Sequence, residues 1–77
     1  MKHALLFATT NLKMKKLVGK VGDAVICEGE PMRFFFKETG TDAIRTVVTS
    51  PVISAATHFN RVSCVKTRNS RYYFWQQ

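Results

Sequence analysis

The sequence predicts an all-β fold: a small half-open antiparallel barrel of five or six short strands. Turn-forming residues interrupt the chain every few residues from Gly19 to Asn69. The segments between these turns are rich in Val, Ile, Phe, Thr and Tyr, which suit a pleated, half-buried surface. No segment keeps apolar residues at helical spacing over a window of about 11 residues. Short strands at this spacing are typical of a small barrel or sandwich.

The length and composition indicate one small globular domain. A chain of 77 residues forms a single domain, and it buries only about 60–65% of the surface that its unfolded form exposes. Its hydrophobic content of 45% is too high for a disordered chain. A small core leaves room for a binding surface and disfavours a deep catalytic cleft.

The first 13 residues show no strong periodicity and few turn signals. They are compatible with a poorly ordered arm, a short strand or a frayed helix, and we expect residues 14–77 to form the barrel domain. The segment Met14-Lys15-Lys16-Leu17 also resembles an ordinary N-terminus, in which case residues 1–13 are an upstream extension. We expect the fold to survive removal of residues 1–13, because untethered termini contribute little to stability.

The predicted strands follow one another with short connections. They are expected at 16–21, 24–28, 32–37, 43–49 with a continuation at 52–57, 61–67 and 70–75. Residues 39–42 contain Gly40 and predict a hairpin loop, and residues 68–70 predict a tight turn around Asn69. The Ser50-Pro51 pair interrupts the long strand, since proline lacks the N–H that a strand donates. A bulge or bend there would let one strand serve both halves of the barrel.

The alternation of side chains along these strands predicts which residues face the core. Alternate residues of a strand point to opposite faces of the sheet. The expected core residues are Met32, Phe34, Phe36, Ile44, Val48, Val62, Cys64, Tyr72 and Phe74.

Two segments carry a resemblance to known proteins. The run Thr49-Ser50-Pro51-Val52, followed by the run from Val65 to Tyr72, resembles a pattern in small uncharacterised bacterial β-barrel proteins. The segment from Gly22 to Val25 is similar to the opening strand of many small barrels. The resemblance covers residues 20–75 at most, and it implies a fold without implying any activity. The strand pattern predicts a barrel of the Src-homology-3-like or OB-like kind.

The charges are unevenly distributed along the chain. All five acidic residues lie between Asp23 and Asp42, and the chain as a whole has a net charge of +7. Such a field favours polyanionic partners.

Basic and aromatic residues interleave on the faces that should point outward. They are Arg33, Phe35 and Lys37 on one strand, and Arg71, Tyr73 and Trp75 on another. With Lys66 and Arg68 near the second group, these residues predict a nucleic-acid-binding surface: cations for phosphates and rings for stacking on bases. The rings could instead close one end of the core.

Other functions are compatible with the same features. Complementary charges, exposed rings and an edge strand would suit a protein partner or a homodimer, and a small anionic ligand such as a nucleotide is a third alternative. No metal is expected, because no two of His3, His58, Cys27 and Cys64 are closely spaced. We expect no cofactor either.

The sequence also predicts that the protein is not an enzyme. It contains no Gly-x-Ser-x-Gly motif and no phosphate-loop spacing, and Glu28 and Glu30 are expected on a solvated loop or edge. Cys27 and Cys64 are expected to be buried free thiols in a reducing compartment. The apolar stretch that begins at Ala4 is too short for a signal peptide and no run can span a membrane, so we expect a cytoplasmic protein.

Overall fold

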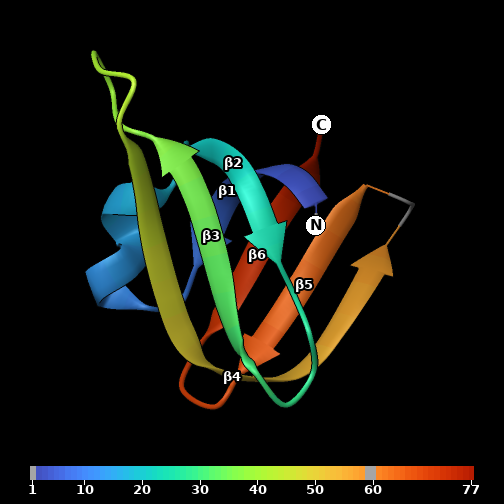
Figure 1. Ribbon diagram of the computed structural model, residues 1–77. Coiled ribbons are helices and arrows are strands. Elements are labelled where there is room, and N and C mark those ends of the chain that lie inside the picture. The colour runs from blue at the N-terminus through green and yellow to red at the C-terminus, as the bar shows by residue number, and fades with distance from the viewer. Residues whose placement is uncertain (1, 59–60) are drawn as a thin grey trace.

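The computed structural model describes residues 2–58 and 61–77. Within them the chain forms six strands and one short 3-10 helix (Figure 1). The elements are β1 (Lys2–Thr9), η1 (Leu12–Leu17), β2 (Val21–Val25), β3 (Pro31–Lys37), β4 (Ile44–His58), β5 (Val62–Thr67) and β6 (Arg71–Gln76). Each strand pairs antiparallel with the next, and β1 also pairs with β6. The predicted all-β fold of short antiparallel strands is confirmed, and its ring of hydrogen bonds is closed, although the barrel is uneven.

The ring is closed by β1, which lies in the segment that we expected to be an arm. Ala4 pairs with Gly22 of β2, and Leu6 pairs with Phe74 of β6. Ala4 and Leu6 are almost completely buried in the core. Of the alternatives left open for residues 1–13, the structure therefore has a strand, and the expectation that these residues are dispensable does not agree with it.

The strand that was expected at 16–21 is absent except for Val21, because a 3-10 helix runs to Leu17 and a turn follows it. The side chain of Asn11 accepts a hydrogen bond from the N–H of Lys13, a typical cap at the start of a helix. Gly19 follows the helix with φ = 98°, a left-handed conformation that favours glycine. The helix turns Leu17 into the core, so one buried side chain is provided without a strand.

The second strand begins and ends three residues earlier than the predicted 24–28. Gly22 belongs to this strand. A glycine is needed at this position, because a side chain there would collide with the carbonyl oxygen of Phe35 on β3. The strand gives way to a turn in which Glu30 donates its N–H to the carbonyl of Cys27, with Gly29 at φ = 87°. These turn interactions occupy the residues that would have continued the strand.

The predicted bend of the long strand at Ser50-Pro51 is confirmed. β4 pairs with β3 as far as Pro51, and with β5 from Val52 onward. Register shifts occur on both sides of the bend, between Pro31 and Arg33 on β3 and between Val52 and Ser54 on β4. One strand thus belongs to both halves of the ring, as Figure 1 shows.

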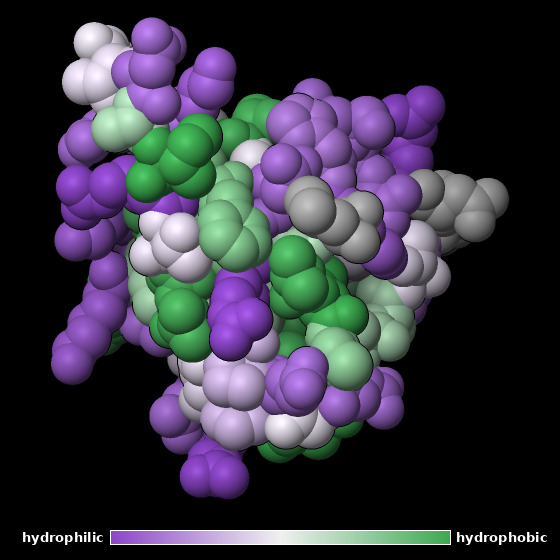
Figure 2. Space-filling model, viewed as in Figure 1, coloured by the Kyte–Doolittle hydropathy of each residue, from purple (hydrophilic) through white to green (hydrophobic). Residues whose placement is uncertain are grey.

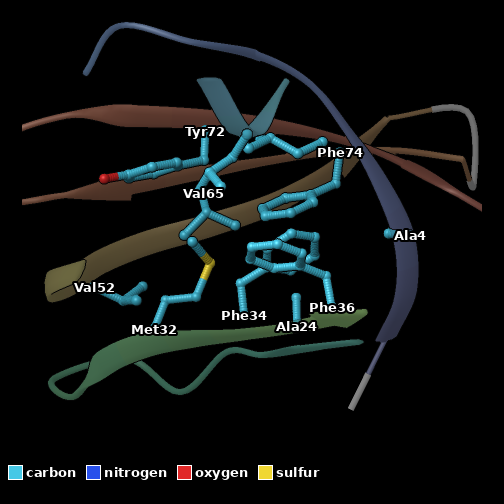
Figure 3. Close-up of a cluster of buried hydrophobic side chains, with 11 residues drawn as sticks. Ala4, Ala24, Met32, Phe34, Phe36, Val52, Val65, Tyr72 and Phe74 are labelled. Carbon is cyan, nitrogen blue, oxygen red and sulfur yellow. The ribbon is translucent and has the colours of Figure 1, made fainter. Parts of the chain in front are cut away.

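The core is built on the rings of Phe34, Phe36 and Phe74 (Figure 3). The centroid of Phe34 lies 5.6 Å from that of Phe36 and 5.5 Å from that of Phe74. Five of the expected core residues are confirmed: Met32, Phe34, Phe36, Tyr72 and Phe74.

The other four expected core residues were assigned wrongly: Ile44, Val48, Val62 and Cys64. On β4, Val47 packs against the core and Thr49 is buried, which leaves Ile44 and Val48 exposed. On β5, the inward residues are Ser63, Val65 and Thr67. The two hydroxyl side chains tolerate burial because each has hydrogen-bond partners, for Thr67 the carbonyl of Ser70 and for Ser63 the side chain of Gln76.

We predict that Leu6→Ala destabilises the protein strongly. The side chain of Leu6 is 2% exposed, and replacing a buried leucine with alanine costs about 2–5 kcal/mol. Leu12→Ala is the matched control, because the side chain of Leu12 is 78% exposed. Denaturant unfolding of both variants measures the difference, and equal stabilities would contradict the role of β1 in the core.

Candidate nucleic-acid interface

The outer face of β6 presents a cation and two rings in a row. Arg71, Tyr73 and Trp75 alternate with the buried Tyr72 and Phe74. Arg71 and Trp75 are exposed and Tyr73 is half-buried. The outward direction that the sequence predicted for these three residues is therefore confirmed.

A third ring joins this row from the neighbouring strand. Phe7 lies where a register shift between Leu6 and Ala8 interrupts the pairing of β1 with β6. Its ring is tilted against Tyr73, with 6.2 Å between the centroids, and 41% of the residue remains exposed. Sequence analysis missed Phe7 because it did not identify β1 as a strand of the barrel.

The turn between β5 and β6 forms a basic hollow at one end of the row. The hollow has a volume of about 250 Å³, and its lining residues are Thr10, Lys66, Thr67, Arg68, Asn69, Ser70 and Arg71. Three of them are cations and none is acidic. Lys66 and Arg71 are directly opposite each other on the paired strands. We call these seven residues the basic hollow.

Hydrogen bonds hold the backbone of the basic hollow in place. The N–H of Thr67 donates to the carbonyl of Ser70 at 2.8 Å, and the hydroxyl of Thr67 donates to the same carbonyl at 3.1 Å. The N–H of Arg71 donates to the hydroxyl of Thr10, and the N–H of Thr10 donates to the carbonyl of Arg71. Arg68 donates its N–H to the carbonyl of Pro51 at the bend of β4. A bound anion would therefore meet a preformed turn.

The cationic side chains of the hollow are not engaged by carboxylates. Within the described residues the ion pairs are His3 with Asp23 and Arg45 with Glu38, both far along the chain from this turn. Glu28 and Glu30, exposed on the loop between β2 and β3 as expected, lie beside Val52 just beyond the bend. The charges of Lys66, Arg68 and Arg71 thus remain available to an anion.

The predicted residues of β3 are in a different place. Arg33 and Lys37 are exposed and Phe35 is half-buried, all on the outer face of β3. In the order of the ring, two strands separate β3 from β6 in either direction. The predicted eight-residue surface is thus divided between opposite sides of the barrel, and the closed ring is the reason.

A second hollow lies on the β3 side, with a volume of about 300 Å³. Phe35 and Lys37 line it together with Val21, Asp23 and other residues of β1, β2 and β4. Asp23 accepts a hydrogen bond from His3 at 3.0 Å in this region. Figure 2 shows apolar side chains reaching the surface between polar ones on this side of the molecule. The mixed lining of this second hollow is a poorer match to phosphate than the lining of the basic hollow.

The cysteines and histidines do not form a site. Cys27 is exposed and Cys64 is half-buried, both as free thiols, so the prediction that both are buried was wrong. Cys27 is exposed because it begins the turn after β2, and Cys64 faces outward opposite Tyr73. His58 is exposed as the last residue of β4.

The described part of the chain contains neither a cluster of metal ligands nor a membrane-spanning helix. Residues 2–58 and 61–77 contain no group of three or more His, Cys, Asp or Glu side chains placed to hold a metal ion. Over the same ranges, no helix combines the length and apolar character that crossing a membrane requires.

Comparison with known proteins returned no relatives. No protein family matches the chain, and no curated protein or solved structure matches it. The resemblance to small bacterial β-barrel proteins therefore stays a prediction.

We predict that Thr67→Val loosens the turn that forms the basic hollow. Thr67 is 1% exposed, and its hydroxyl donates to the carbonyl of Ser70 and accepts from the N–H of Ser70. Without the hydroxyl, the carbonyl and N–H of Ser70 each lose a hydrogen-bond partner. This should lower the free energy of unfolding by about 1–3 kcal/mol. Thr46→Val, at an exposed position of β4, is the matched control. Thermal or denaturant unfolding that does not separate the two variants would contradict this assignment.

Proposed function

We propose that the protein is a non-catalytic module that binds nucleic acid through one side of the barrel. The binding surface consists of the cations of the basic hollow and the rings of Phe7, Tyr73 and Trp75. The observation that carries the proposal is the hollow itself, which three cations line without any acidic neighbour in the lining. The two free thiols are compatible with a reducing, cytoplasmic location.

The chemistry of the hollow suits phosphate groups. Arg68 and Arg71 each offer a planar fork of N–H donors that matches two phosphate oxygens, and Lys66 adds a compact charge. The hydroxyls of Thr10 and Ser70 lie in the same lining. Contacts of this kind orient a nucleic acid on the protein without reading its sequence, which agrees with a module of weak sequence preference.

The rings favour a single strand over a duplex. Alternate residues of a strand lie about 6.7 Å apart, so Tyr73 and Trp75 present their rings in succession beyond Arg71. Flat rings on an outward β-surface bind bases that are free to leave their stack, whereas the bases of a duplex are already stacked. A strand whose phosphates occupy the hollow would carry its next bases over these rings.

The residues of β3 are not part of this proposed site. Arg33, Phe35 and Lys37 lie on the opposite side of the ring, and one short strand of nucleic acid would not reach both sides. They therefore supply a control of the same chemical composition.

We predict that the double substitution Arg68→Glu and Arg71→Glu abolishes most binding to a labelled single-stranded oligonucleotide. Each phosphate contact contributes about 0.7 to the slope of log K against log salt for single strands. The slope should therefore shrink by at least about 1.4 when two contacts are lost. Fluorescence anisotropy at several salt concentrations measures this, and light scattering checks that the mass in solution is unchanged.

The matched control is Arg33→Glu with Lys37→Glu, which changes the net charge by the same amount on the other side of the barrel. This variant should keep most of the affinity. An equal loss in both double variants would show that only the overall charge matters, and a wild-type protein that does not bind at low salt would end the proposal.

We predict that Trp75 reports binding directly. It is the chain's single tryptophan and is 44% exposed, so a base stacked on it should quench the protein's tryptophan fluorescence. Trp75→Ala should cost about 1–3 kcal/mol of binding free energy, whereas Ile44→Ala, at an exposed apolar position of β4, should cost little. Quenching by a duplex as strong as that by its separate strands would contradict the single-strand preference.

A further inference from the structure

The second half of β4 has a partner on only one of its edges. Residues 54–58 pair with β5, from Ser54 opposite Lys66 to His58 opposite Val62. On the other edge, the loop that contains Glu28 and Glu30 bonds to Val52. Beyond Val52, no described residue pairs with that edge. Figure 1 shows this part of β4 at the margin of the fold, with β5 beside it.

The backbone groups on the open edge can be identified. Thr67 of β5 donates its N–H toward β6, to Ser70. Because these directions alternate along a strand, Lys66 and Cys64 direct their backbone groups toward β4, to Ser54 and Ala56. The N–H and C=O groups of Ala55 and Thr57 must then point to the open edge. Unpaired groups of this kind form a template for another strand.

The segment itself lacks the residues that usually prevent strands from pairing, and the ammonium of Lys2, which reaches it, donates to the hydroxyls of Thr57 and Ser63. Residues 53–58 (Ile-Ser-Ala-Ala-Thr-His) contain no Lys, Arg, Asp, Glu, Pro or Gly, although charge and proline are the common protections. The first half of β4 differs. It carries Arg45, and Met14 and Leu17 of the lysine-rich helix η1 line the same small cavity as its Val47 and Thr49. A second copy of this cationic chain would be repelled there.

We propose that residues 54–58 pair with the same residues of a second copy, antiparallel across a two-fold axis. The axis would pass at Ala56, so that the Ala56 residues of the two copies lie opposite each other as a non-hydrogen-bonded pair. Ala55 of each copy would then face Thr57 of the other, and Ser54 would face His58. Ala55 and Thr57 of opposite copies then exchange their N–H···O=C bonds on both sides of the axis, so the pairing satisfies the open groups of both residues in both copies.

Charges at the two ends of the segment favour a second copy over an unrelated strand. Glu28 and Glu30 lie beside Val52 at the start of the segment, and the exposed Arg61 follows its end. Antiparallel pairing brings the end of one copy to the start of the other. It therefore places Arg61 of each copy near the acidic loop of its partner, twice per dimer. This inference is independent of the nucleic-acid proposal, because the edge and the basic hollow share no residue.

The test compares two variants that gain the same charge. The side chain of Ala56 is exposed, and Ala56→Lys places two like charges close to the axis. Thr46→Lys adds an identical charge at an exposed position in the half of β4 that pairs with β3. In sedimentation equilibrium without nucleic acid, we expect wild type and Thr46→Lys to dimerise equally, and Ala56→Lys to raise the dissociation constant at least tenfold. A monomeric wild type at millimolar concentration, or equal weakening by both substitutions, would overturn the proposal.

Hydrogen exchange of the unmodified protein provides a second test, which does not depend on the folding of any variant. The amides of Ala55 and Thr57 should exchange several-fold more slowly as the protein concentration rises into the dimeric range. The amide of Ala56, which bonds to β5, should change little. Exchange rates of Ala55 and Thr57 that do not depend on concentration would contradict pairing at this edge.

Discussion

The pairing of β1 with β6 is the interaction on which the rest of this structure depends. It joins residues that are more than sixty positions apart in the sequence, such as Leu6 and Phe74, and it turns a six-stranded meander into a closed ring. Without it, β1 and β6 would each expose a row of unpaired backbone groups, and the buried Leu6 would lose Phe74 as its neighbour. A domain of this size has little stability to lose.

The same pairing also shapes the candidate site. Thr10, just beyond the end of β1, exchanges two hydrogen bonds with Arg71 and so forms one wall of the basic hollow. The irregularity between Leu6 and Ala8 turns Phe7 outward against Tyr73. Stability and the proposed binding surface therefore have a common origin, and damage to β1 would affect both.

Local signals in the sequence were enough to predict the fold class, the bend at Pro51 and the inward faces of β3 and β6. In those strands large aromatic residues alternate with charged ones, so the pattern is strong. On β5 the inward and outward faces were exchanged in the prediction, because the hydroxyl residues Ser63 and Thr67 point inward. Hydropathy does not anticipate burial of a hydroxyl whose hydrogen-bond partners come from β6 and its turn. β1 was missed because its partners are remote in the sequence.

The candidate site could be predicted in part for similar reasons. The row from Arg71 to Trp75 follows from alternation within one strand, and Lys66 and Arg68 are its neighbours through a short turn. The separation of Phe35 from this row depends on the order of strands around the ring, which no local pattern contains. Thr10 and Phe7 join the site only through the closure by β1, so their contribution could not be seen before the topology was known.

The antiparallel course of β1 and β6 places the two ends of the described chain together, away from the basic hollow. Gln77 donates its N–H to the carbonyl of His3, whereas Thr10 and Arg71 meet at the opposite end of the same two strands. A linker attached at either end would therefore leave the barrel on the side that faces away from the hollow. Immobilised on a sensor surface or fused to a second protein, the domain would present its basic turn outward whichever end is used as the tether.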